Sequence, residues 1–280
     1  MATAQIPSNR FRPLEKLIVS LSNLGSQLIF MAKSLADMVP ATRHVQEIGR
    51  LVSEITLGAG ALLVGAGTAG VIFFMSFFTG TQVGLEGFKG LQLIGAEAFT
   101  GFIGAFANTR EITPLIAGVT LAAQVGCGFT AELGAMRVNE EIDALEVMAV
   151  RPVPYLVSTR ILAALIAIIP LYLISLYASY FATELVVVDL LGLSSGTYGH
   201  YFSLFLPPID VLYSLIKVMI FAIAVALIHC YYGFNASGGP AGVGVAVGRA
   251  IRASIVAVNI LNLMLSSVMW GVTDTVRIAG

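Results

Sequence analysis

Apolar residues dominate five long stretches of the chain, and short polar or glycine-rich segments separate them. A membrane-spanning helix needs about 20 consecutive apolar residues to cross a hydrocarbon core roughly 30 Å thick. Five stretches reach that length, at residues 56–79, 112–134, 155–184, 209–233 and 250–273. The third and fifth are long enough to tilt or to project beyond the bilayer. The pattern predicts an all-α integral membrane protein with five transmembrane helices.

A different pattern precedes the first span. Between residues 14 and 39, leucine and methionine recur at intervals of three and four, and polar residues fill the opposite side. An amphipathic helix of this kind lies in the membrane interface. Residues 43–54 are polar and predict a connection into the first span. We therefore expect an N-terminal tail and interfacial helix over residues 1–54 and a transmembrane domain over 55–280, in one structural domain overall.

The segment at 91–108 decides the topology. It is apolar but short, rich in glycine and interrupted by Glu97. With five spans and a cytoplasmic N-terminus, the arginines of the 135–152 and 234–252 connections are cytoplasmic, and the 185–208 loop carries no Lys or Arg. The positive-inside rule favours this arrangement. We expect 91–108 to be a re-entrant or surface helix on the outer side of the plasma (inner) membrane, and 234–248 to be a flexible glycine loop.

Composition excludes several classes of function. The chain is 57% hydrophobic and 11% charged with a mean hydropathy of +0.90, against about 25% charged residues in soluble domains. Its net charge of −1 gives no basic surface for nucleic acid. The sequence has no phosphate-binding loop, no nucleophile elbow and no histidines at metal-ligand spacing. We expect a non-catalytic chain that binds no metal and no cofactor.

The region between the second and third spans is unusually acidic. Five of the chain's 16 acidic residues lie between Thr130 and Pro152. From Asn139, a suitable N-cap, the sequence predicts a short amphipathic helix that ends before Pro152. Its apolar face would be exposed in the cytoplasm unless a partner covers it. The alternative is a solvated loop whose charges keep it out of the membrane. We expect partner docking through Asn139, Glu140, Glu141, Ile142, Asp143, Leu145, Glu146 and Met148.

Two further sets of residues are candidates for function. Ala61, Gly65, Ala69 and Gly70 provide small residues at four-residue spacing in the first span. Such residues let a second helix approach closely, either from another subunit or from this chain. Charged residues at membrane depth often mark a transport pathway. Arg110 and Glu111 at the outer mouth of the second span, and Lys217 in the fourth, are the candidates. Alternatively, Lys217 pairs with a neighbour, and Arg110 and Glu111 cap a helix.

The acidic segment also carries a specific motif. Glu132-Leu-Gly-Ala-Met136 is followed by Glu140-x-Ile-Asp-Ala-Leu145, and Arg110-Glu111-x-x-Pro114 lies upstream. These residues resemble the MlaE/YrbE permeases of Mce-type ABC lipid transporters, and the chain is most similar to the actinobacterial YrbE type. The resemblance covers nearly the whole chain. It implies that the acidic helix is a coupling helix between spans two and three.

The resemblance also implies partners. Two permease subunits form the membrane core, and two paralogous subunits are favoured over two identical ones. Each docks one subunit of a cytoplasmic ABC ATPase dimer, which binds the ATP and Mg²⁺. Mce-domain proteins on the outer side deliver a lipid, which is a fatty acid, mycolic-type lipid or sterol moving inward. Two other hypotheses stay open at this point: a self-contained secondary transporter or channel, and a membrane scaffold for a cytoplasmic complex.

Overall fold

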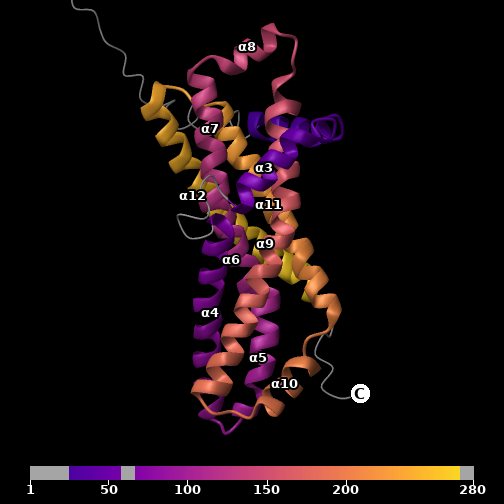
Figure 1. Ribbon diagram of the computed structural model, residues 1–280, viewed down its shortest axis with the longest axis vertical. Coiled ribbons are helices and arrows are strands. Elements are labelled where there is room, and N and C mark those ends of the chain that lie inside the picture. The colour runs from indigo at the N-terminus through magenta and orange to yellow at the C-terminus, as the bar shows by residue number, and fades with distance from the viewer. Residues whose placement is uncertain (1–24, 58–66, 272–280) are drawn as a thin grey trace, which may run out of the picture.

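Five helical stretches of the structure are long and apolar enough to cross a membrane: Gly67–Gln92, Glu97–Val138, Val153–Leu190, Pro208–Phe234 and Gly239–Trp270. The structure is a computed structural model that describes residues 25–57 and 67–271, and within these ranges it contains no strand. The long helices run along the molecule, with α8 (Glu141–Val147) at one end and α10 (Ser195–Leu204) at the other (Figure 1). We call these the α8 end and the α10 end. The prediction of an all-α membrane protein with five spans is confirmed.

Two of the five long stretches, Glu97–Val138 and Val153–Leu190, are composite, because α-helical pieces are joined by 3-10 or π turns. In chain order the remaining elements are α2 (Met38–Ala41), α3 (Val45–Leu57), α4 (Gly67–Gln92), η1 (Glu97–Phe99), α5 (Thr100–Ala107), η2 (Asn108–Ile112), α6 (Thr113–Leu121), η3 (Ala122–Gly126), α7 (Cys127–Val138), η4 (Val153–Ser158), α9 (Thr159–Glu184), η5 (Leu185–Leu190), α11 (Pro208–Phe234) and α12 (Gly239–Trp270). Here η1 is a 3-10 helix, and η2 to η5 are π-helical.

The helices α4 and α9 form the most extensive contact in the bundle. A side chain at Gly80 of α4 would overlap the backbone carbonyl of Ser179 in α9, so only glycine allows this approach. The hydroxyl of Thr183 donates a hydrogen bond to the carbonyl of Gly80 at 2.9 Å. The hydroxyls of Ser76 and Ser175 lie 2.5 Å apart in the same interface. Small residues thus hold the two helices together through close backbone contact.

This packing corrects the first predicted span. The prediction ended the span at residue 79, where glycine and polar residues begin, but α4 continues to Gln92, and Gly80 and Gly84 in this part pack against α9. The predicted beginning at residue 56 also differs, since α3 runs to Leu57 and the described part of the span begins at Gly67. Residues 58–66 lie outside the described residues.

The expectation of a separate re-entrant or surface helix at 91–108 was wrong. Residues 97–108 belong to one helical stretch of 42 residues, Glu97–Val138, which is about 63 Å long at 1.5 Å per residue. The predicted span 112–134 is only its central part. Gly101 packs against the backbone of α10, and Gly104 lies against the phenol of Tyr198. Gly101 and Gly104 are therefore sites of close packing, whereas Gly95, at φ 69°, lies in the turn before this stretch.

The N-terminal segment lies across the α8 end of the bundle (Figure 1). Residues 25–36 are helical, as predicted, and residues 14–24 of the predicted helix lie outside the described residues. Phe30 and Met31 pack against the core, whereas Leu28 and Ile29 are 66% and 72% exposed. The helix thus presents apolar side chains both to the bundle and to its surroundings.

The predicted polar connection at 43–54 forms most of the helix α3. Ile48, Leu51 and Ile55 are buried against the core, mainly beside α9. On the opposite face, Arg50 pairs with Glu47 at 2.7 Å and with Glu54 at 3.0 Å. The hydrogen bond from Arg50 lowers the pKa of the Glu47 carboxyl. The segment is amphipathic and lies along the bundle.

The last helix begins earlier than predicted. Gly238 and Gly239, with φ of 89° and 69°, make the turn that starts α12, so residues 239–248 are helical and not a flexible loop. The span predicted at 250–273 corresponds to α12, which ends at Trp270. In its most apolar window only 11% of α12 is buried, against 56% for the second and third spans. Most of this helix therefore faces outward.

A pair of alanine substitutions in α4 tests the close contact with α9. Gly80→Ala should lower the stability by about 1–3 kcal/mol, because the added methyl group must push the two helices apart. Gly90→Ala in the same helix is the control, since a side chain there meets nothing within 4 Å. The measurement is the midpoint of thermal unfolding in detergent. Equal midpoints for the two variants would contradict the contact.

Candidate functional site

The charged residues predicted as site residues fall into two places far apart in the molecule. The acidic residues lie on or next to α8, at one end (Figure 1). Arg110, Glu111 and Lys217 meet inside the bundle, where η2, α11 and α12 come together.

The helix α8 is shorter than predicted and begins later. Asn139 is not its N-cap but ends α7, and its backbone N–H bonds to the carbonyl of Ala135 at 2.9 Å. Glu140 then takes a left-handed conformation with φ of 60° and turns the chain into α8. Ala149, also at φ 60°, turns the chain out again. Two sharp turns at non-glycine residues therefore define the helix.

The apolar face of α8 is covered by the chain itself. Ile142 is fully buried and Leu145 packs against the same core cluster, so the expectation that they are exposed was wrong. The docking role of the helix stays a prediction. The exposed apolar residues are Val147 at 88% and Met148 at 65%. The predicted amphipathic pattern was correct. The pattern does not indicate whether the chain itself or a partner protein covers the apolar face of α8.

The acidic residues of this region divide into two groups. Glu140, Glu141, Asp143 and Glu146 are on or next to α8 and are exposed or partly exposed, and Asp143 pairs with Arg137 at 2.6 Å. Glu132 lies in α7 instead, where its carboxylate pairs with Arg160 of α9 at 2.7 Å. Arg160 is 2% exposed. The sequence prediction missed it, although an arginine inside a predicted span was a visible signal.

A buried ion pair joins the second and fourth spans. The guanidinium of Arg110 contacts the carboxylate of Asp210 through Nη2 at 2.7 Å and Nε at 2.8 Å. Trp270 of α12 donates its indole N–H to the other carboxylate oxygen at 2.9 Å. The guanidinium also lies over the ring of Phe106 at 4.3 Å. This arrangement pairs both charges and brings α12 into the same cluster.

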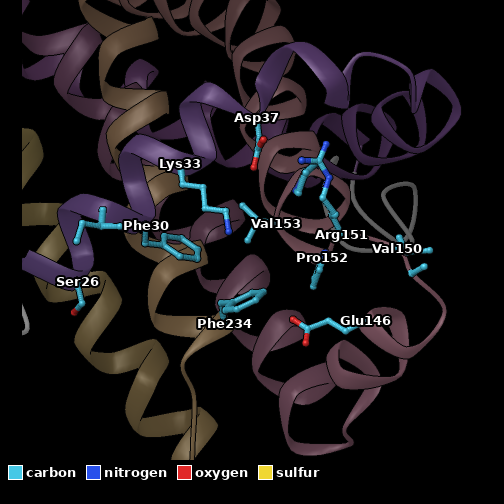
Figure 2. A pocket seen from close by; sticks show the side chains of 13 residues that line it. Ser26, Phe30, Lys33, Asp37, Glu146, Val150, Arg151, Pro152, Val153 and Phe234 are labelled. Carbon is cyan, nitrogen blue, oxygen red and sulfur yellow. The ribbon is translucent and has the colours of Figure 1, made fainter.

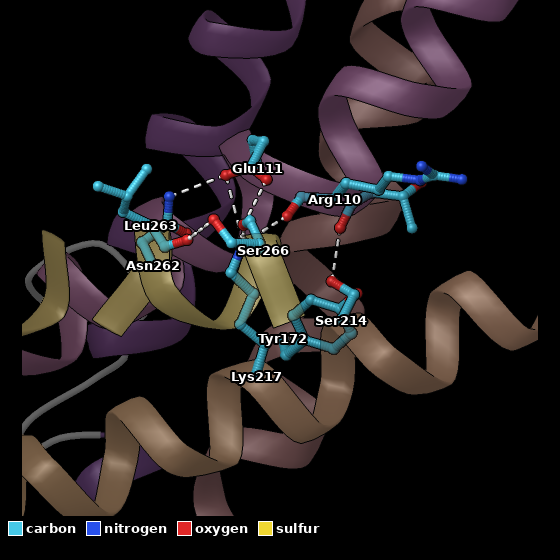
Figure 3. A network of polar contacts seen from close by, with 10 residues as sticks. Arg110, Glu111, Tyr172, Ser214, Lys217, Asn262, Leu263 and Ser266 are labelled. Atoms are coloured by element: carbon cyan, nitrogen blue, oxygen red, sulfur yellow. Dashed lines mark hydrogen bonds and ion pairs between the residues drawn. The ribbon is translucent and has the colours of Figure 1, made fainter. Parts of the chain in front are cut away.

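Lys217 forms the second half of this network (Figure 3). Its ammonium is fully buried and donates to the carbonyl of Arg110 at 2.7 Å, to Ser266 at 2.6 Å and to Glu111 at 3.3 Å. Glu111 also accepts from Asn262 at 2.8 Å and from Ser266 at 2.5 Å. The alternative that Lys217 pairs with a neighbour is confirmed. Arg110 and Glu111 lie in η2, inside the long second helix, and do not cap a helix end.

One member of the network is accessible from outside. The side chain of Glu111 is 42% exposed, whereas those of Arg110, Asp210 and Lys217 are at most 5% exposed. Leu263 of α12, which is 71% exposed, lies beside the residues that hold it (Figure 3). A carboxylate is thus presented at an apolar surface, between three spans. Glu111 lies in the π turn η2, and π turns in helices often mark functional sites.

The small residues of the first span are only partly described. Ala61 and Gly65 lie outside the described residues. Ala69 packs against the core of its own chain, and Gly70 is buried. Their role in packing against a second subunit stays a prediction.

The buried pair between Arg110 and Asp210 should be costly to break. Asp210→Asn leaves the guanidinium buried without its counter-charge, which costs about 3–5 kcal/mol. Asp143→Asn removes the carboxylate of an exposed pair and should cost about 1 kcal/mol or less. The measurement is the free energy of unfolding of both variants in detergent. A cost for Asp210→Asn no larger than that for Asp143→Asn would contradict the buried pairing.

Comparison with known proteins identifies the family. The family model described as Permease MlaE matches residues 58–268. The chain is 32% identical over 211 residues to a probable ABC transporter permease protein of Rickettsia bellii, covering 75% of this chain and 82% of that protein. A probable ABC transporter permease protein of Synechocystis is 29% identical over 214 residues, covering 76% and 81%. The protein TRIGALACTOSYLDIACYLGLYCEROL 1, chloroplastic, of Arabidopsis thaliana is 28% identical over 214 residues, covering 76% and 61%. The chain therefore belongs to the MlaE permease family and is a multi-pass transmembrane permease subunit of an ABC transporter.

Proposed function

We propose that this permease moves a lipid across the plasma (inner) membrane as one of two permease subunits of an Mce-type ABC transporter. A separate cytoplasmic ATPase supplies the energy and binds the ATP and Mg²⁺, and this chain binds no cofactor. The proposed cargo is a fatty acid, a mycolic-type lipid or a sterol, and the proposed direction is import. The name of the Arabidopsis relative, which contains that of a galactolipid, supports a lipid cargo.

The observation that carries the proposal is the exposed carboxylate of Glu111 beside the apolar face of α12. A carboxylate is expensive to leave at an apolar surface, so this position favours a ligand that is polar at one end and apolar along its length. A hydroxyl or protonated carboxyl group at the polar end would donate a hydrogen bond to Glu111, beside Asn262 and Ser266. The hydrocarbon part would lie along α12, where each buried methylene contributes about 0.8 kcal/mol.

A second permease subunit would close this surface into a cavity. The exposed side chains of α12 include Ile260, Leu263 and Val268, and the helix is mostly unburied in a single chain. A dimer also follows from the ABC permease family. We favour a paralogous partner over an identical one, on the resemblance to the actinobacterial type.

We propose that the α8 end is cytoplasmic, as is the N-terminus. Basic residues gather at that end, namely Lys33, Arg43, Arg50, Arg137, Arg151, Arg249 and Arg252. At the α10 end, Lys89 is the basic residue among the described residues that lie outside the buried network. The positive-inside rule supports this orientation. Mce-domain proteins would then meet the α10 end and deliver the lipid from outside.

The proposed coupling begins at α8. Its exposed residues Val147 and Met148 and its acidic side chains would contact the ATPase, with the acids setting orientation more than affinity. Ile142 anchors α8 in the same core as α7, α9 and α11. When ATP closes the ATPase dimer, α8 would move, and the spans packed around Ile142 would move with it. The cavity beside Glu111 would then change its opening.

A charge placed on the exposed end of α8 tests the docking. Val147→Asp should strongly reduce co-purification of the ATPase subunit, because it puts a charge into a contact that should be desolvated. Leu93→Asp is the matched control, since Leu93 is also 88% exposed but lies in the turn at the α10 end. Undiminished ATPase co-purification with Val147→Asp would refute the assignment of α8.

Neutralising the exposed carboxylate tests the lipid pathway. Glu111→Gln keeps the size of the side chain but removes its charge, so lipid uptake by the intact transporter should fall about tenfold, equivalent to about 1.4 kcal/mol, while the ATPase still co-purifies. Glu86→Gln, on the exposed side of α4, should leave uptake unchanged. Normal uptake by Glu111→Gln would contradict a role for this carboxylate in the pathway.

A further inference from the structure

A second potential binding site lies at the α8 end, away from the Glu111 network. A cavity of about 660 Å³ opens between the N-terminal helix (residues 25–36), the segment that follows α8, and the end of α11. This volume lies in the range of about 300–1,000 Å³ that is usual for small-molecule sites. Its floor is apolar and includes Phe30, Val153 and Phe234. The proposed transport path does not account for this cavity. Val147 and Met148 do not line it, and Glu146 is the one acidic residue of α8 that lines it and is also proposed to contact the ATPase.

Four charged side chains surround this apolar floor. Lys33 and Asp37 come from the N-terminal segment, and Glu146 and Arg151 come from α8 and the loop after it. Figure 2 shows Lys33 and Glu146 reaching toward the space between these elements from opposite sides. The cavity therefore has two positive and two negative groups, and their charges sum to zero.

These four groups do not neutralise one another. Among the described residues, the ion pairs of the chain involve Arg50, Arg110, Arg137, Arg160 and Lys217, and none involves the four groups of the cavity. A ligand that carries both a positive and a negative group could form charge-assisted hydrogen bonds with all four side chains. Such hydrogen bonds are stronger than those between neutral groups. A ligand with one anionic and one cationic group matches this arrangement. A purely anionic ligand would lie against Asp37 and Glu146.

The position of the cavity indicates where the ligand comes from. The same N-terminal segment exposes Leu28, Ile29 and Val39, which are 66%, 72% and 78% accessible. A helix with charged residues on one side and exposed large apolar residues on the other is typical of the membrane interface. Because Ile29 also lines the cavity, the site is continuous with the surface that would contact lipid.

We propose that this cavity binds the headgroup of a zwitterionic phospholipid of the phosphatidylethanolamine type. Lys33 and Arg151 bind the phosphate, and Glu146 and Asp37 bind the ammonium. The glycerol and the first methylenes pack over Phe30 and Ile29. The lipid would fix the N-terminal helix to α8, as a resident lipid and not as cargo. The proposal depends on the α8 end lying at a membrane surface and on no other part of the proposed function.

The test uses the full-length protein in bilayer discs containing equal amounts of phosphatidylethanolamine and phosphatidylglycerol. A trace of photoactivatable phosphatidylethanolamine is cross-linked, and the labelled peptides are identified by mass spectrometry. We expect labelling of the peptides that contain Ile29 and Phe234. Lys33→Ala and Glu146→Gln should each reduce this labelling about tenfold, equivalent to about 1.4 kcal/mol. Lys33→Arg should retain it, because the positive charge is kept.

Two matched controls separate the site from general charge effects. Arg43→Ala and Glu141→Gln change exposed charges at the same end of the molecule, but neither residue lines the cavity. Both should label like the unaltered protein, and unfolding midpoints identify any variant that has lost its fold. Because no ATPase is present, failure of the proposed transport function leaves this result unaffected.

Three outcomes would overturn the proposal. The first is labelling that does not change with Lys33→Ala and Glu146→Gln. The second is equal labelling by a photoactivatable phosphatidylglycerol, which would show a site without preference for a zwitterion. The third combines unchanged lipid labelling of Lys33→Ala in the discs with loss of ATPase co-purification when the same variant is purified separately from cells that make the whole transporter, which would assign the cavity to a protein partner.

Discussion

The buried ion pair between Arg110 and Asp210 is the constraint on which the arrangement of the spans depends. Neither charge can lie in hydrocarbon alone, so the second and fourth spans must meet where these residues face each other. The same region must also accommodate Lys217, whose ammonium reaches the backbone carbonyl of Arg110 and two side chains. The fifth span is held through Trp270, Asn262 and Ser266. Polar contacts thus fix a helix that is otherwise little buried.

Close backbone contact between helices is the second interaction that holds the spans together. Within a membrane, apolar side chains do not drive helices together, since lipid is as apolar as they are. The pair α4 and α9 relies instead on Gly80 and on the hydroxyls of Ser76, Ser175 and Thr183. One end of the molecule is therefore joined by small residues, and the middle of the bundle by charged ones.

The sequence predicted the number of spans, the helix in the N-terminal segment and the location of α8. Each of these follows from local periodicity. The sequence could not predict that residues 97–108 continue into the second span. A glycine that ends a helix cannot be distinguished in the sequence from a glycine that allows close packing within one. Nor could the sequence pair Arg110 with Asp210, since 100 positions separate them. The periodicity around Ile142 revealed an apolar face, but burial by the chain's own core is a tertiary property.

The two left-handed residues that bound α8 have a thermodynamic consequence. Glu140 and Ala149 replace the flexible glycines usual at such turns, and each such conformation costs about 1–2 kcal/mol. With Ile142 fixed in the core, α8 has little freedom to move independently of the spans. Binding at two sites joined by such a rigid connection is coupled, and the coupling free energy is the same whichever ligand binds first. In the proposed transporter, nucleotide binding that changes the affinity for lipid through α8 would be matched by an equal effect of lipid on the affinity for nucleotide, so the ATPase would respond to whether the permease is occupied.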